Sequence, residues 1–125
     1  MKKLTLSSRE RLKDPKTIAQ LLQEGIALFS YPVKLVYLHI PYDGGPYRFG
    51  VTVPRRKIKK AVKRNTIKRR IREAFRLNKE IISTLGTEKN VTYALFAIYV
   101  ANEEIDYRII ENSMKKILNN MVNNL

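Results

Sequence analysis

The chain of 125 residues contains no cysteine and a single histidine. Without cysteine there is no disulfide, no thiol nucleophile and no zinc site with cysteine ligands. The one histidine, His39, lies among apolar residues, so we interpret it as a packed or rim residue rather than a catalyst. Stability must therefore come from a hydrophobic core, and a chain of this length can bury an adequate one.

Long apolar runs are also missing. No stretch approaches the roughly 18 apolar residues of a membrane span. The N-terminal run MKKLTLSSRERLKDPK lacks the apolar segment of a signal peptide. These absences favour a cytoplasmic protein with no membrane partner. The length fits a single domain over residues 1–125, in which we expect residues 1–13 to form a mobile or loosely packed arm.

The sequence also lacks the residue motifs with which a protein would itself catalyse hydrolysis. The sequence has no Asp-x-Asp or Glu-x-x-His pair and no glycine-rich phosphate loop before a lysine. Three carboxylates, Glu103, Glu104 and Asp106, fall where a helix is expected to begin, and the helix dipole alone accounts for them. We therefore predict no catalytic and no metal-binding residue in the protein.

Acidic residues are scarce in one segment in particular. The whole chain carries 25 Lys and Arg against 11 Asp and Glu, a net charge of +14. Residues 55–79 hold thirteen basic residues and one acidic residue, so the other hundred residues contribute a net charge of only +2. A charge excess that is concentrated in one fifth of the chain predicts a polyanionic partner.

The basic segment has the periodicity of an amphipathic helix over residues 60–82. At about 100° per residue, one third of the circumference collects an apolar stripe of Ile67, Ile71, Ala74, Phe75 and Ile82. Like charges three or four residues apart on the other face destabilise a helix by roughly 0.2–0.5 kcal/mol per pair, and a phosphate backbone would neutralise them. The alternative to polyanion binding is that the basic residues form an ordinary solvated helix face. For Asn65, the alternative to a contact role is a capping role. The residues expected to contact the polyanion are Lys60, Lys63, Arg64, Asn65, Lys68, Arg69, Arg72 and Arg76.

Helix signals flank the rest of the chain. Asp14 and Pro15 have the residue types of an N-cap and a first helical position, and Gly25 is a plausible end of that helix. Near the C-terminus, Asn102 is expected to cap a last helix. One face of this helix is expected to carry an apolar stripe of Ile110, Met114, Ile117, Leu118 and Met121, which recur at helical spacing.

Strands are expected at residues 33–40, 47–53 and 91–100. The first two are joined by the turn sequence PYDGGP, which predicts an antiparallel hairpin. The third is apolar on both faces, which is typical of a central buried strand. The order α-β-β-(β)-α-β-α, in which one further strand stays optional, indicates an α+β fold, a small α–β sandwich.

The run KKAVKRNTIKRRIREAFR, residues 59–76, resembles the signature of the protein component of bacterial ribonuclease P. That family carries Ala-Val-x-Arg-Asn-x-x-Lys-Arg, which stands here at residues 61–69, followed by Arg72 and Phe75. The early SRERLK, the strand RFGVTVPRR and the apolar strand and helix after the signature follow in family order. The resemblance thus extends over most of the chain.

The resemblance implies a partner and a reaction. The partners would be the catalytic RNA of ribonuclease P and precursor tRNA, whose 5′ leader is removed by magnesium-dependent hydrolysis. The RNA would carry the catalysis and bind most of the Mg²⁺, with the protein as an accessory subunit and no obligate protein partner. The fold would include a left-handed crossover around the basic helix, against the usual right-handed rule.

The resemblance also implies a cleft between the first helix and the sheet that holds the single-stranded leader. The family often has Phe at two positions of the first helix that are Ile18 and Leu22 here, and these side chains cannot stack on bases as rings do. The segment PRRKIKK is one residue longer than the commoner family pattern. The strand pattern alone is equally consistent with a core position for Tyr37, and it favours a core position over a cleft position for Phe49. The residues expected in the cleft are Tyr37, Phe49, Arg55, Arg56, Ile18 and Leu22.

Two other functions compete with this hypothesis. The first is a structural RNA-binding protein, ribosomal or chaperone-like, with no role in cleavage. The second is a DNA-binding protein, but the segment before the basic helix has the pattern of a strand, so no helix-turn-helix pair is expected. The spacing of the signature favours the ribonuclease P subunit.

Overall fold

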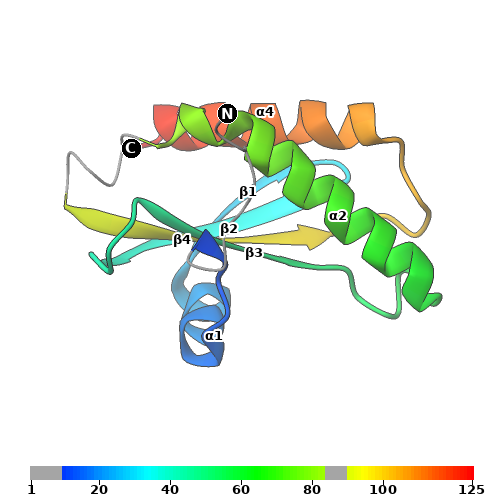
Figure 1. The fold of residues 1–125 in the computed structure, drawn as a ribbon, viewed down its shortest axis with the longest axis horizontal. Coiled ribbons are helices and arrows are strands. Elements are labelled where there is room, and N and C mark those ends of the chain that lie inside the picture. The colour runs from blue at the N-terminus through cyan, green and yellow to red at the C-terminus, as the bar shows by residue number, and fades with distance from the viewer. Residues whose placement is uncertain (1–9, 84–89) are drawn as a thin grey trace, which may run out of the picture.

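The computed structural model describes residues 10–83 and 90–125. In this part of the chain the four strands form one sheet, with α2 and α4 side by side on one face and α1 on the other (Figure 1). The α+β class and the element order are as expected. The elements are α1 (Pro15–Glu24), β1 (Ile26–Ser30), β2 (Val33–Pro41), β3 (Tyr47–Thr52), α2 (Ala61–Asn78), the 3₁₀ helix η2 (Lys79–Ile81), β4 (Val91–Tyr99) and α4 (Tyr107–Asn123).

The sheet has the order β1-β2-β4-β3, so β4 lies at its centre. It pairs antiparallel with β2 and parallel with β3. The expected hairpin between β2 and β3 is therefore wrong. The connection PYDGGP has to span two inter-strand spacings of about 4.8 Å, which a tight turn cannot do. The prediction that the most apolar strand is central and buried is confirmed, because β4 contributes side chains to both core clusters.

The optional additional strand is β1, which follows α1 almost directly. It pairs antiparallel with β2 from Ile26↔Tyr37 to Ser30↔Val33. Its mostly exposed residues give it no clear alternation in sequence, which explains why the strand was not located there. Gly25 makes the sharp junction possible, because a Cβ at this position would collide with the Val36 side chain and would lie 2.5 Å from the carbonyl oxygen of Leu21.

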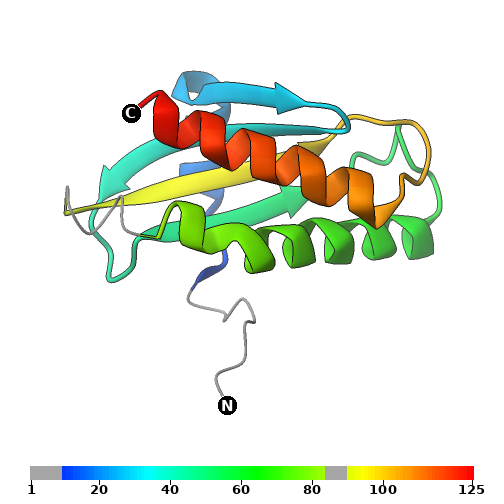
Figure 2. The same cartoon turned by 90° about the horizontal axis from the view of Figure 1, so that it is seen from above.

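The connection from β3 through α2 to β4 is left-handed. Figure 2 views the sheet from the side of α2 and α4, with β3 and β4 both running from left to right and β4 above β3. If the strands are turned to point upward, the chain leaves β3 towards the viewer and returns to its left. This is the rare sense of crossover, and it agrees with the expectation from the family resemblance.

The main core lies between the sheet and the pair α2 and α4. The predicted stripe of α2 is confirmed, since Ile67, Ile71 and Phe75 are fully buried. The ring of Phe75 stacks on Phe49 with centroids 4.0 Å apart and an angle of 4° between the planes. Tyr47 packs edge-on against the same ring at 5.2 Å. Aromatic contacts between α2 and β3 therefore fix the orientation of the basic helix.

Two helix starts can be compared with their predictions. The α1 start is confirmed, because the Asp14 carboxylate accepts a hydrogen bond from the Lys16 amide and Pro15 is the first helical residue. The α4 start is not at Asn102 but at Tyr107, with Asp106 as N-cap. The reason is the buried Tyr99, whose hydroxyl donates to the carbonyl oxygen of residue 103 at 2.6 Å and accepts from the amide of residue 105 at 3.0 Å. These two bonds hold the preceding segment in a loop.

Residues 10–13 of the expected arm are packed rather than loose. The Leu12 amide donates to the Phe49 carbonyl at 2.9 Å, and the Leu12 side chain joins the small core under α1. The Glu10 carboxylate accepts from the Tyr47 hydroxyl and lies 3.0 Å from the Lys79 ammonium. Residues 1–9 of that expected arm lie outside the described residues.

If the aromatic stack pins α2, then Phe75→Ala should lower the free energy of unfolding by about 3–5 kcal/mol, since a large ring is lost from a closed core. Urea unfolding followed by circular dichroism measures this change. Leu77→Ala is the matched control on the same helix, because Leu77 is 44% exposed, and it should change stability by no more than about 0.5 kcal/mol. Equal losses for the two variants would contradict the assignment of the core face.

Candidate nucleic-acid interface

The outer face of α2 presents a set of cations without acidic partners. Lys60, Lys63 and Arg69 are exposed, and Lys68 is half-buried. Among residues 10–83 and 90–125, none of these four side chains has an ion pair with a carboxylate. Asn65 is exposed on the same helix and makes no capping bond, since the N-cap residue is Lys60. The buried apolar stripe holds this face outward, where a phosphate backbone can reach it.

Arg64 has a different environment from the other candidates. Its guanidinium donates to the carbonyl oxygens of Ile58 at 3.0 Å and Lys59 at 2.8 Å. Ile58 is buried and anchors the loop that enters α2. Arg64 therefore braces this loop, and through it the backbone that carries Lys59 and Lys60. Its remaining N–H groups stay available to a phosphate.

Two further arginines of α2 are neutralised within the protein. Arg76 pairs with Glu73 one turn earlier, with Nε 2.9 Å from the carboxylate. Arg70 points towards the start of α4, where it lies 2.9 Å from Glu104 and donates to the Ile105 carbonyl. Of the eight residues expected to contact a polyanion, Arg76 is thus the least available for binding, because its charge is already paired with Glu73. Arg70, which was not among them, serves to fix the loop before α4.

The other face of the sheet carries a cavity of about 440 Å³ between α1, residues 11–13 and β3. Ile18 and Phe96 give it an apolar wall, and Gly50 lies on the β3 side. Three cations border it, Arg11, Lys13 and Arg72. Ile18 was expected here from the sequence. Phe96 could have been found from the alternation of β4, whereas Arg11 and Lys13 lie in a segment expected to be loose.

Of the two aromatic residues expected in the cleft, Tyr37 does not line this cavity, whereas Phe49 borders it with its ring turned into the core. Both side chains are 2% exposed and belong to the core beneath α2 and α4. The reason is strand alternation: α1 packs on the face that carries Val36, so the ring of Tyr37 lies on the opposite face. Burial raises the pKa of the Tyr37 hydroxyl. Phe49 borders the cavity, but its ring is stacked on Phe75.

The remaining expected cleft residues are all accessible. Leu22 is 57% exposed on α1, beyond the residues that line the cavity. Arg55 and Arg56 are exposed in the turn that follows β3. Neither arginine has an ion pair in the described part of the chain. They extend the basic surface from the end of β3 to the start of α2.

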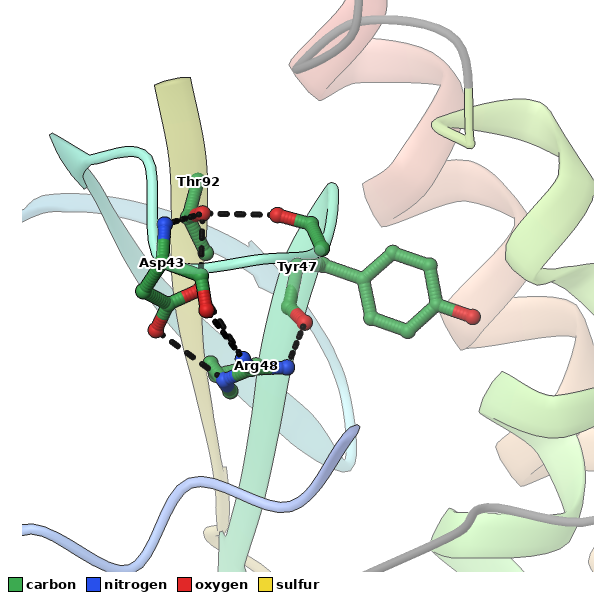
Figure 3. A network of polar contacts seen from close by, with 5 residues as sticks. Asp43, Tyr47, Arg48 and Thr92 are labelled. Atoms are coloured by element: carbon green, nitrogen blue, oxygen red, sulfur yellow. Dashed lines mark hydrogen bonds and ion pairs between the residues drawn. The ribbon is translucent and has the colours of Figure 1, made fainter. Parts of the chain in front are cut away.

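The connection between β2 and β3 is held by a separate polar network (Figure 3). Arg48 pairs with Asp43 through Nη2 at 2.9 Å and Nε at 3.1 Å. The hydroxyl of the buried Thr92 accepts from the Asp43 amide at 3.0 Å and lies 2.6 Å from the carbonyl oxygen of Gly45. Tyr47, the neighbour of Arg48, points in the opposite direction, towards the helices. The charge of Arg48 is therefore neutralised by Asp43 and is not free for an anionic partner.

Acidic and histidine side chains do not gather anywhere in the described residues. No three of them lie close enough together to hold a metal ion. His39 lies exposed at the rim of β2, where its ring meets Tyr93 edge-on at 6.5 Å. Nor does any described helix have the length and hydropathy to cross a membrane.

Comparison with known proteins identifies relatives over almost the whole chain. The family model for ribonuclease P matches residues 6–122. A ribonuclease P protein component from Porphyromonas gingivalis is 35% identical over 122 residues, which covers 96% of this chain and 88% of that protein. One from Syntrophus aciditrophicus is 39% identical over 102 residues, covering 75% and 83%.

Solved structures share the fold. The RNase P protein from Thermotoga maritima superposes with a TM-score of 0.69 at 24% identity, covering 90% of this chain and 97% of that one. The RNase P protein of Staphylococcus aureus gives a TM-score of 0.66 at 23% identity, with 90% and 94% covered.

The bracing role of Arg64 predicts a stability effect that the exposed cations lack. Arg64→Ala should lower the free energy of unfolding by about 1 kcal/mol, since two carbonyl groups lose a charged donor. Arg69→Ala removes the same charge from an exposed position and should cost no more than about 0.5 kcal/mol. Urea unfolding of the free protein distinguishes them, and an Arg64 variant as stable as the wild type would contradict the brace.

Proposed function

The chain belongs to the ribonuclease P protein family, and from this premise we propose that it binds the catalytic RNA and the 5′ leader of precursor tRNA. By holding both, it promotes the cut that leaves the mature 5′ end of tRNA. The observation that carries this proposal is the outer face of α2, a helix that the core holds in one orientation. There the family signature presents Lys63, Lys68 and Arg69, which have no ion pair with any residue that the structure describes. The site of action would be the cytoplasm, where precursor tRNA is made.

The two basic surfaces of the protein differ in chemistry, and this difference indicates which RNA each one binds. Arginine and lysine side chains on α2 can grip phosphates of a folded RNA, and each contact releases a counterion. The cavity beneath α1 has apolar walls and a basic rim, which suits a single strand with exposed bases. We therefore assign the catalytic RNA to α2 and the leader to the α1 side.

The chemistry itself we assign to the RNA. Magnesium binds through carboxylate and phosphate oxygens, and the described residues offer no carboxylate cluster that fits such an ion. RNA supplies phosphate oxygens in abundance, so Mg²⁺ would be held there and would activate the attacking water. The protein's own contribution is then electrostatic and positional, with cations that reduce repulsion between the two RNA molecules.

Cleavage of a precursor tRNA by a cognate catalytic RNA at low magnesium concentration tests this function. The RNA alone should cleave slowly there because few cations screen the phosphates, and addition of the protein should raise the rate strongly. The protein alone should cleave nothing. Tight binding without any rise in cleavage would support instead a structural RNA-binding protein.

The cations of α2 should also determine how binding depends on salt. Arg69→Ala should weaken binding of the catalytic RNA and reduce the slope of log K against log salt by about one. Lys116→Ala is the control, because it removes one positive charge from an exposed position on α4. The account fails here if both variants keep the wild-type slope, or if both lose the same amount.

A further inference from the structure

The strand β1 is an edge of the sheet whose apolar side chains are exposed. Its sequence IALFS, residues 26–30, contains no charged residue and no proline. Ile26 is 54% exposed and Phe29 is 63% exposed. These two side chains lie on opposite faces of the strand, because successive residues alternate between the faces. Apolar surface is therefore exposed on both sides of one strand edge, which is typical of an interaction site.

The two edges of the sheet differ in how they are covered. At the β3 edge, residue 11 forms a parallel bridge with Phe49, and the Leu12 amide donates to the Phe49 carbonyl at 2.9 Å. At the β1 edge, no residue of the described ranges 10–83 and 90–125 bonds to the outward backbone groups of residues 26–30. Natural sheets protect such an edge with charges, proline or a covering segment. The edge of β1 has none of these among the described residues, so it is open to pairing with another strand.

The sequence of β1 is complementary to itself. An antiparallel pair of β1 strands centred on Leu28 places Ile26 opposite Ser30 of the second copy. The same register places Ala27 opposite Phe29. Each of these pairs joins a large side chain with a small one, and none brings two like charges together. A two-fold axis at Leu28 therefore satisfies both copies through the same contacts, as in most homodimers.

The distribution of charge also favours a second copy as the occupant. Two proteins with a net charge of +14 repel each other unless their charges lie far apart. Residues 55–79 hold thirteen basic residues and one acidic residue, and Figure 2 shows α2 along the edge of the sheet opposite β1. Residues 14–31, which include α1 and β1, carry only one Lys, one Asp and one Glu. Pairing through β1 therefore keeps the two basic faces at opposite ends of the assembly.

We propose that β1 pairs antiparallel with β1 of a second copy of this chain, which joins two four-stranded sheets into one continuous sheet. Five residues from each strand are far fewer than the roughly 20–30 residues per side of a standard interface. The dimer is therefore weak, with a dissociation constant in the micromolar range. Each copy keeps the outer face of α2 free for RNA. The inference concerns the free protein and does not depend on the proposed function.

Sedimentation equilibrium of the full-length protein across the micromolar range measures this association. The wild type should change from monomer to dimer as its concentration rises. Phe29→Lys should weaken the dimer about tenfold or more, because two new cations enter one small interface. Leu77→Lys is the matched control, since it adds the same charge in place of an apolar residue that is 44% exposed on α2, and it should associate like the wild type. Melting temperatures show whether each variant folds.

Disulfide formation tests the register, because the chain contains no cysteine of its own. In the proposed pairing the two copies of residue 28 face each other with Cα atoms about 4.5–5.5 Å apart, within the range of roughly 4.4–6.8 Å that a disulfide requires. The two copies of residue 26 are four positions out of step, about 14 Å apart. Under mild oxidation Leu28→Cys should form a covalent dimer quickly. Ile26→Cys should form one slowly, although its side chain is the more exposed of the two.

Three results would overturn the inference. A wild-type protein that stays monomeric throughout the micromolar range would show that the β1 edges do not pair. A dimer that folded Phe29→Lys leaves intact would show that the two copies meet at another surface. Disulfide formation by Leu28→Cys that is no faster than that of Ile26→Cys would exclude a two-fold axis at residue 28.

Discussion

The packing of α2 against β3 is the constraint on which the binding surface depends. A helix with this many like charges is poor on its own, since each pair three or four residues apart costs roughly 0.2–0.5 kcal/mol. Burial of a large apolar side chain contributes about 1.5–3 kcal/mol, and Ile67, Ile71 and Phe75 are all fully buried. The apolar stripe therefore outweighs the repulsion on the outer face. The stack of Phe75 on Phe49 also sets which way that face points.

Acidic residues determine which cations remain free. Glu73 and Glu104 neutralise arginines on the α4 side of α2, and Asp43 neutralises Arg48 near the turn between β2 and β3. No such partner reaches Lys63, Lys68 or Arg69 in the described part of the chain. The excess charge of the protein is thus directed to the outer face of α2 and to the edge of β3. These two places meet at Arg72, which belongs to both the helix and the cavity.

The features that could be predicted from the sequence are those that depend on residues close together in the chain. The apolar stripe of α2 follows from a period of 3.6 residues, and the central place of β4 follows from apolar residues on both of its faces. The N-cap at Asp14 depends only on its neighbours in the chain.

Features set by distant partners were not predictable in this way. The pairing of β3 with β4 instead of β2 depends on a strand that lies about forty residues later in the chain. Tyr37 lies in the main core because α1 covers the other face of the sheet. The sequence pattern of β2, which is apolar on both faces, does not show which face each helix covers. Arg11 becomes part of the cavity only because Leu12 docks over Gly50.

Lysine acetylation of the protein, alone and in complex with the catalytic RNA, tests the central claim that one pinned helix face receives the RNA. Mass spectrometry reports each lysine separately. Lys60, Lys63 and Lys68 should become protected in the complex, while Lys115 and Lys116 on α4 should react as they do in the free protein. Protection of the α4 lysines, with the α2 lysines still reactive, would contradict the account, because the RNA would then bind the neighbouring helix α4 instead of α2.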